Sequence, residues 1–166
     1  MKVRDILLTL IAGALLIGCT PTPNRSINSA TIKKNILGTW YSKNLYNARD
    51  SVKIQSRAID TFYRNGTLLS TEYLTYIDKK GKVLGKIRYK RYFKWSLRGN
   101  ELTMRFRNCT SRILKRPRNN KVEFVTDIMN IACKYANRLS RRKISSEKIY
   151  DISRHKLMVG DKILYR

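Results

Sequence analysis

Runs of β-branched and aromatic residues, separated by turn signals, predict a mainly β chain. The clearest hairpin signal is Asn65-Gly66, which lies between two such runs, and further turns are predicted at 78–81 and 97–100. The predicted strands cover residues 38–46, 52–63, 67–77, 82–95, 101–114, 148–153, 157–159 and 163–166. Seven or eight meandering strands predict a small up-and-down β-barrel or a strongly bent sheet.

One late segment shows the spacing of a helix. Apolar residues recur there at steps of four, three, four and four: Phe124, Ile128, Ile131, Tyr135 and Leu139. We therefore expect an amphipathic helix over 125–141, although Phe124-Val125-Thr126 also suits a strand and leaves two short strands as the alternative. A single helical turn is expected over 32–37, capped by Ser29 or Thr31.

The first nineteen residues have the layout of a secretory signal. A charged start, Met1–Arg4, precedes about a dozen apolar residues, too few at ~1.5 Å each to cross a bilayer of ~30 Å. Leu16-Ile17-Gly18-Cys19 resembles the lipobox of bacterial lipoproteins. This resemblance implies a lipoprotein signal peptide at residues 1–18 and lipidation of Cys19. A plain signal peptide with a chance cysteine, or an uncleaved anchor, is the alternative.

Residues 19–31 then form the lipidated cysteine and a flexible tether, since residues 20–30 are rich in Pro, Ser, Asn and Thr. Thr20, where inner-membrane lipoproteins carry Asp, implies by resemblance to the Gram-negative sorting pattern an outer-membrane protein that faces the periplasm. Fatty-acyl chains such as palmitate would fix it firmly to the membrane of the cell envelope.

The chain is strongly basic, with 36 Lys and Arg against 11 Asp and Glu. Residues 1–18 contain Lys2, Arg4 and Asp5, so 34 basic and 10 acidic residues remain after them, a charge near +24. Such a charge favours polyanionic partners, here phospholipid head groups, lipopolysaccharide phosphates, anionic glycans or an acidic protein. The export signal makes nucleic acid an unfavoured partner. A general drift of composition toward basic residues is the alternative explanation.

Two cysteines remain once Cys19 is assigned to the lipid. Cys109 and Cys133 are expected to form a disulfide, because paired thiols are the usual outcome in an oxidising compartment. Metal binding is not expected, since His155 is the only histidine and no Cys-x-x-Cys spacing occurs. No cofactor is expected.

Three motifs and the closing strands resemble bacterial lipocalin-like (calycin-type) lipoproteins: Ile36–Trp40, Phe62–Leu68, Trp95–Leu102 and Ile149–Arg166. The resemblance implies a lipocalin-like barrel domain over residues 32–166, with a basic insert at about 105–146 that departs from the pattern. It also implies that Trp40 closes the narrow end of the barrel and that Arg166 packs across its ring.

We expect this barrel to bind a small amphiphilic or anionic ligand such as a fatty acid, a lipid or a bile-salt-like molecule. Strand alternation places four aromatic side chains inside: Tyr73, Tyr89, Phe93 and Phe106. It places four cations around the opening: Arg88, Lys90, Arg105 and Arg107. A barrel filled by its own side chains, with no ligand, is the alternative.

A second hypothesis is a protein–protein interaction module that assists a membrane-anchored regulator or envelope machinery. The amphipathic helix or an open barrel edge would then contact the partner. Catalysis is not expected, because the sequence offers no nucleophile beside an oriented base and His155 stands alone in a turn.

Overall fold

The computed structural model describes residues 28–47, 52–116, 131, 133–138 and 144–166. These residues form a helix, eight strands and a short late helix that contains residues 133–138. The labelled elements are α2 (Ser29–Ile36), β1 (Gly38–Asn47), β2 (Lys53–Phe62), β3 (Thr67–Ile77), β4 (Val83–Arg98), β5 (Glu101–Lys115), β6 (Ile144–Ile152), β7 (Lys156–Val159) and β8 (Lys162–Tyr165).

The eight strands form a closed antiparallel barrel in which each strand pairs with the next one in the sequence. The predicted mainly β barrel with seven or eight strands is therefore confirmed. At the predicted Asn-Gly hairpin, Gly66 has φ +77° and its backbone packs against β4, so a Cβ there would lie 3.3 Å from the Trp95 carbonyl oxygen. The turn thus needs glycine both for its conformation and for its close approach to β4.

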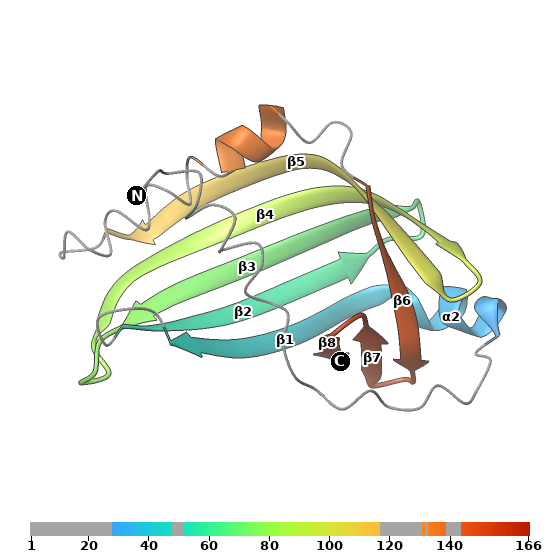
Figure 1. Ribbon diagram of the computed structural model, residues 1–166, viewed down its shortest axis with the longest axis horizontal. Coiled ribbons are helices and arrows are strands. Elements are labelled where there is room, and N and C mark those ends of the chain that lie inside the picture. Colours follow the sequence, from blue (N-terminus) through green and yellow to red (C-terminus); the bar gives the residue numbers. More distant parts are fainter. Residues whose placement is uncertain (1–27, 48–51, 117–130, 132, 139–143) are drawn as a thin grey trace, which may run out of the picture.

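The barrel is closed more fully at one end than at the other. β5 pairs with β6 only over Glu101–Arg105, and β1 pairs with β8 only at Tyr41 and Tyr165. The short strands β6, β7 and β8 therefore lie at the end that also holds α2, and β1 to β5 extend beyond them (Figure 1). In the extended half, the described wall consists of β1 to β5 alone.

Helix α2 packs into the fully closed end. Ile32 and Ile36 are completely buried, and the indole N–H of Trp40 donates to the Ile36 carbonyl at 2.8 Å. The helix begins earlier than predicted, because the Asn28 side chain, rather than Ser29 or Thr31, caps it by accepting from the Ala30 N–H at 2.9 Å. The last residues of the predicted tether, 29–31, accordingly belong to the helix.

Two apolar clusters fill the barrel at different levels. The first surrounds Trp40 at the closed end: Ile32, Ile36, Phe62, Leu68, Leu102, Ile149, Ile152, Leu157, Val159 and Leu164. The second lies in the extended half: Leu74, Tyr76, Ile87, Tyr89, Cys109 and Cys133. Helix α2 and strands β6 to β8 supply most of the first cluster, whereas inward positions of β3 to β5 supply most of the second.

Part of the predicted late helix lies within the described residues, and it is helical there. Two of its five apolar positions are described, and both are exposed: Ile131 at 61% and Tyr135 at 51%. The signal peptide 1–18, Cys19, most of the tether and three further apolar positions (Phe124, Ile128 and Leu139) lie outside the described residues.

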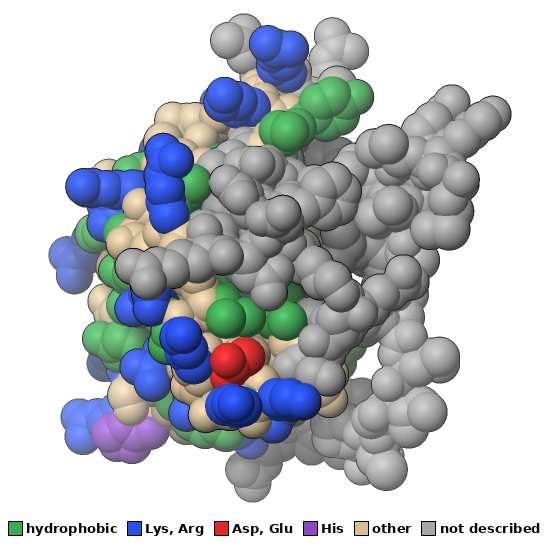
Figure 2. All heavy atoms as spheres, turned by 90° about the vertical axis from the view of Figure 1, so that its left-hand side faces the viewer, with side chains coloured by type: hydrophobic (Ala, Val, Ile, Leu, Met, Phe, Trp, Pro, Cys, Tyr) green, Lys and Arg blue, Asp and Glu red, His purple; other side chains and the backbone are tan. Residues whose placement is uncertain are grey.

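Basic side chains dominate the end of the barrel where β1 to β5 extend. Figure 2 shows this end, and the described surface there carries many Lys and Arg side chains and little Asp or Glu. The strong positive charge of the sequence is therefore spread over the barrel wall as well as over the predicted insert.

Candidate functional site

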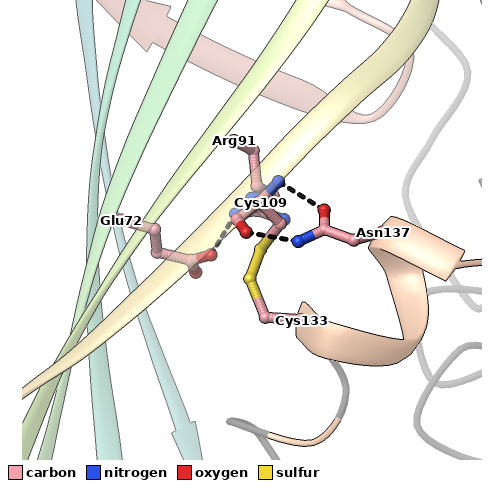
Figure 3. The surroundings of a disulfide bond; sticks show 5 residues. All are labelled: Glu72, Arg91, Cys109, Cys133 and Asn137. Carbon is pink, nitrogen blue, oxygen red and sulfur yellow. Dashed lines mark hydrogen bonds and ion pairs between the residues drawn. A yellow bond between two sulfur atoms is a disulfide. The ribbon is translucent and has the colours of Figure 1, made fainter.

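A disulfide joins the late helix to β5. Cys109 and Cys133 are bonded, with their Cα atoms 5.5 Å apart, which confirms the predicted pair (Figure 3). Both cysteines are buried, and Cys109 lies directly opposite Arg91 on β4. The bond therefore sits beside an inward-facing arginine in the extended half of the barrel.

Asn137 reinforces this attachment by pairing with β5 as a neighbouring strand would. Its Oδ1 accepts from the Cys109 N–H at 2.7 Å, and its Nδ2 donates to the Cys109 carbonyl at 2.8 Å (Figure 3). Cys109 lies beyond the stretch of β5 that pairs with β6. One amide side chain thus satisfies two backbone groups on a part of the β5 edge that no described strand pairs with.

A polar layer lies inside the barrel next to this attachment. Arg91 forms an ion pair with Glu72 (Figure 3). The other carboxylate oxygen of Glu72 accepts from the Ser56 hydroxyl at 2.7 Å. Asp60 belongs to the same layer: burial raises the pKa of its carboxyl above the ordinary value, while the Ser70 hydroxyl and the Arg91 charge oppose the rise. The layer therefore contains one ion pair and one carboxyl, that of Asp60, whose ionised form is destabilised by burial.

Four polar atoms around this layer are buried and have no hydrogen-bond partner among the described residues: Asp60 Oδ1, Tyr76 OH, Tyr89 OH and Arg91 Nε. Tyr76 is 1% and Tyr89 7% exposed, and burial raises the pKa of Tyr76 to about 12 and that of Tyr89 further. Both hydroxyls are therefore protonated donors at neutral pH. Most buried polar groups in proteins have a partner, so such a cluster is a candidate binding site.

Solvent reaches part of this layer. The Arg91 side chain remains 38% exposed and that of Glu72 21%, although both point to the inside of the barrel. Solvent therefore reaches the interior at the level of the ion pair, whereas the residues of the cluster around Trp40 are buried.

The four predicted interior aromatics divide between the two faces of the wall. Tyr89 is buried inside, and Phe93 and Phe106 pack edge to face with ring centroids 5.7 Å apart. Tyr73 lies on the outer face, contrary to the sequence expectation, because Leu74 and Tyr76 take the inward positions of β3. Its ring lies 5.7 Å from the Lys86 ammonium on the outside.

The four predicted rim cations do not surround the opening. Arg88 and Lys90 lie on the outer face in the middle of β4, and Arg105 is exposed on β5 opposite Lys94. Arg107 is exposed at a β-bulge, where the register shifts between Phe93–Phe106 and Tyr92–Asn108. On β4, Arg91 points inward instead and pairs with Glu72.

Sequence reasoning missed Asp60, Glu72 and Tyr76 as members of the polar layer. Arg91 did give a signal, because it interrupts the apolar face shared by Ile87, Tyr89, Phe93 and Trp95. Glu72 gives a similar one between Ser70 and Leu74 on β3. A charged residue at an inward position on each of two neighbouring strands is the pattern that could have located the ion pair.

At the closed end, the structure places Arg166 across the Trp40 ring, as the family resemblance implies. Its guanidinium carbon lies 4.3 Å from the ring centroid. The same guanidinium donates to the Asn35 carbonyl at 2.9 Å and to the Leu37 carbonyl. Both residues are structural and lie away from the polar layer.

The sequence matches no protein-family model and no curated protein. Within the described ranges, no group of three or more His, Cys, Asp or Glu side chains is arranged to hold a metal ion. None of the described helices combines the length and the hydropathy that crossing a bilayer requires.

Proposed function

We propose that this chain is a lipid-anchored lipoprotein of a bacterial cell envelope whose lipocalin-like barrel binds a small amphiphile without catalysing a reaction. The observation that carries the proposal is a pair of buried hydroxyls, those of Tyr76 and Tyr89, which lack a hydrogen-bond partner in the described part of the chain and lie beside a solvent-accessible Arg91. A barrel built only for stability would gain from phenylalanine at both positions, because an unsatisfied buried hydroxyl costs free energy.

The chemistry around the layer favours an amphiphile with an acceptor-rich head, such as a fatty acid. The hydroxyls of Tyr76 and Tyr89 and the Nε–H of Arg91 are donors. Tyr89 interacts electrostatically with both Tyr76 and Arg91. Partly buried apolar residues pack around them in the extended half: Val52, Ile54, Leu84, Phe106 and Ile113. The ligand head would therefore point to the polar layer, and its chain would lie along these apolar side chains.

The cellular location rests on the sequence alone. The lipobox at Leu16–Cys19 supports lipidation of Cys19, and Thr20 supports the outer membrane with the barrel in the periplasm. Two or more acyl chains give stable membrane attachment.

Native mass spectrometry of the protein, extracted mildly from its own membrane, tests both parts. The proposal expects a retained amphiphile of defined mass that is lost on unfolding, and release of a Cys19→Ala variant from the membrane in a high-salt wash. A protein that carries no small molecule, with a single stoichiometric protein partner instead, would contradict the binding role. A Cys19→Ala variant that stays membrane-bound after a high-salt wash, which removes electrostatic binding, would contradict the lipid anchor alone.

One observation favours the interaction module as a second candidate. Ile131 and Tyr135 are large apolar side chains, and both are exposed on a helix that a disulfide and Asn137 hold in place. Exposed apolar residues on a rigidly attached helix suit a helix-in-groove contact with another protein. The mass measurement above separates the two candidates.

A further inference from the structure

Four basic residues and one tyrosine form a row across the outer face of five strands. The register places the following residues directly opposite one another from β1 to β5: Lys43, Arg57, Tyr73, Arg88 and Arg112. The alternate positions on these strands hold buried residues such as Ser56, Leu74 and Tyr89, so the row points away from the barrel interior. Four cations thus line one transverse stripe of the wall.

The row is unfavourable for the isolated protein. Lys43 lies opposite Arg57, and Arg88 lies opposite Arg112, and like charges in directly opposite positions destabilise a sheet. Within the described residues, none of these four side chains forms an ion pair. The acidic residues in the middle of these strands, Asp60 and Glu72, point to the inside instead. A row of this kind is explained by an anionic partner that offsets the repulsion.

A groove and exposed apolar side chains adjoin the row. The groove, of about 750 Å³, is lined by Tyr41, Lys43, Arg57, Tyr73, Lys86 and Tyr165, among others, and no carboxylate is among its lining residues. On the same outer face of β1 and β8, three large side chains are 50–61% exposed: Tyr41, Leu45 and Tyr165. Tyrosine is the residue type that suits a membrane–water interface, since its ring is apolar and its hydroxyl is polar.

We infer that this outer face docks the barrel onto an anionic lipid surface, with the basic row and Lys86 on the headgroup phosphates and the exposed tyrosines at the interface. Five neighbouring strands at ~4.8 Å spacing make the row about 19 Å wide, too wide to serve a single headgroup. A repeated array of negative charges matches it. This surface is separate from the interior polar layer, so it does not depend on the ligand proposed above.

Vesicle flotation of the full chain carrying Cys19→Ala tests the docking surface without a contribution from the lipid anchor. We expect binding to vesicles of equal phosphatidylglycerol and phosphatidylcholine to exceed binding to pure phosphatidylcholine by at least about a hundredfold. The excess should fall steeply between 0.05 and 0.5 M salt, because exposed charges are screened over roughly 30 to 3 Å in the range from 0.01 to 1 M.

The row variant replaces all four cations by glutamine: Lys43→Gln, Arg57→Gln, Arg88→Gln and Arg112→Gln. Each cation near an anionic surface contributes about fivefold, so this variant should lose at least about a hundredfold in affinity. The matched control removes four exposed cations elsewhere: Lys33→Gln, Lys34→Gln, Lys148→Gln and Arg154→Gln. The control should lose less than about tenfold, because its net charge changes equally but its positions lie off the row.

Equal losses for the row variant and the control would overturn the inference and leave only a net-charge effect. Binding to single-stranded DNA that is as tight as binding to the anionic vesicles would overturn the assignment to a membrane. The single variant Arg57→Gln, which removes one like-charge contact, keeps the test valid if the fourfold variant does not fold. It should bind anionic vesicles about fivefold more weakly and should melt at an equal or higher temperature.

Discussion

Single side chains decide the character of the barrel interior. Asp60, Glu72 and Arg91 occupy inward positions that apolar residues would fill in a barrel built for packing alone. The sequence indicated a polar position here, since Arg91 interrupts an otherwise apolar face of its strand. It could not place Tyr73, because a shift of one residue moves a side chain to the opposite face and only the pairing with neighbouring strands sets the register.

Asp60→Asn should make stability less dependent on pH. The folded-state pKa of Asp60 lies above its ordinary value of 3.8, chiefly because of burial, so the folded protein holds this proton more tightly than the unfolded chain does. The Asp60 carboxyl therefore costs nothing at a pH below the ordinary value and destabilises the fold increasingly as the pH rises through the folded-state pKa. Urea unfolding of both proteins from pH 3 to pH 7 measures the difference.

The free energy of unfolding of Asp60→Asn, minus that of the parent, should rise over this pH range and then level off. Other carboxyls titrate in both proteins and cancel in the difference. A constant difference would show that the Ser70 hydrogen bond and the Arg91 and Lys162 charges balance burial at this position, and a difference that falls with pH would show that they outweigh it.

Arg166→Ala should destabilise the closed end by about 1–2 kcal/mol, because the variant loses the contact with the Trp40 ring and the donors to two carbonyls. Arg166→Lys should lie between the two proteins, since a lysine keeps the charge but lacks the planar group that stacks on the ring. Thermal unfolding measures both variants. No loss in Arg166→Ala would contradict the structural role of this contact.

At the level of elements, the strands next to local turn signals were predicted well, whereas strand ends and bulges that depend on long-range pairing were not. The Asn65-Gly66 hairpin depends on neighbouring residues, so the strands on both sides of it were predicted within one residue. β6 begins at Ile144 instead of Lys148, because its first residues pair with β5 some 40 positions earlier in the chain. The bulge at Arg107 has the same cause, since the register of two strands sets it.

The disulfide and Asn137 should act together to hold the late helix on β5. Replacing Cys133 by serine opens a covalent loop across a sequence separation of 24 and should cost about 3 kcal/mol by the chain-entropy estimate. Asn137→Ala should cost about 1–3 kcal/mol by leaving the Cys109 N–H and carbonyl without a partner. Urea unfolding with intact and reduced protein separates the two terms.

Because both changes release the same helix, the double variant should lose less than the sum of the two single losses. Strictly additive losses would show that the helix is held at two independent points. An unchanged stability of Asn137→Ala would contradict the edge-pairing role of this amide.

At the scale of the whole molecule, the barrel divides into a packed half and an accessible half. The sequence predicted the barrel from its strands and turns, but the division depends on how far β5 and β6 pair, which no local pattern reports. The packed half surrounds Trp40, and the accessible half contains the ion pair, the two buried hydroxyls and the attached helix. The packed half therefore stabilises the fold, and the polar layer lies inside the accessible half.

The central claim is that the interior polar layer binds the head of an amphiphile. The most direct test is a fluorescence titration with the fatty acid cis-parinaric acid. The parent protein is the delipidated Cys19→Ala chain, and two variants, Tyr89→Phe and Tyr73→Phe, are made in it. Each variant loses one tyrosine hydroxyl, the first inside the barrel and the second on its outer face. Tyr89→Phe should bind the probe about fivefold or more weakly, corresponding to about 1 kcal/mol for one hydrogen bond, and Tyr73→Phe should bind it like the parent. Parent protein that does not bind the probe, or equal affinities for all three proteins, would contradict the claim.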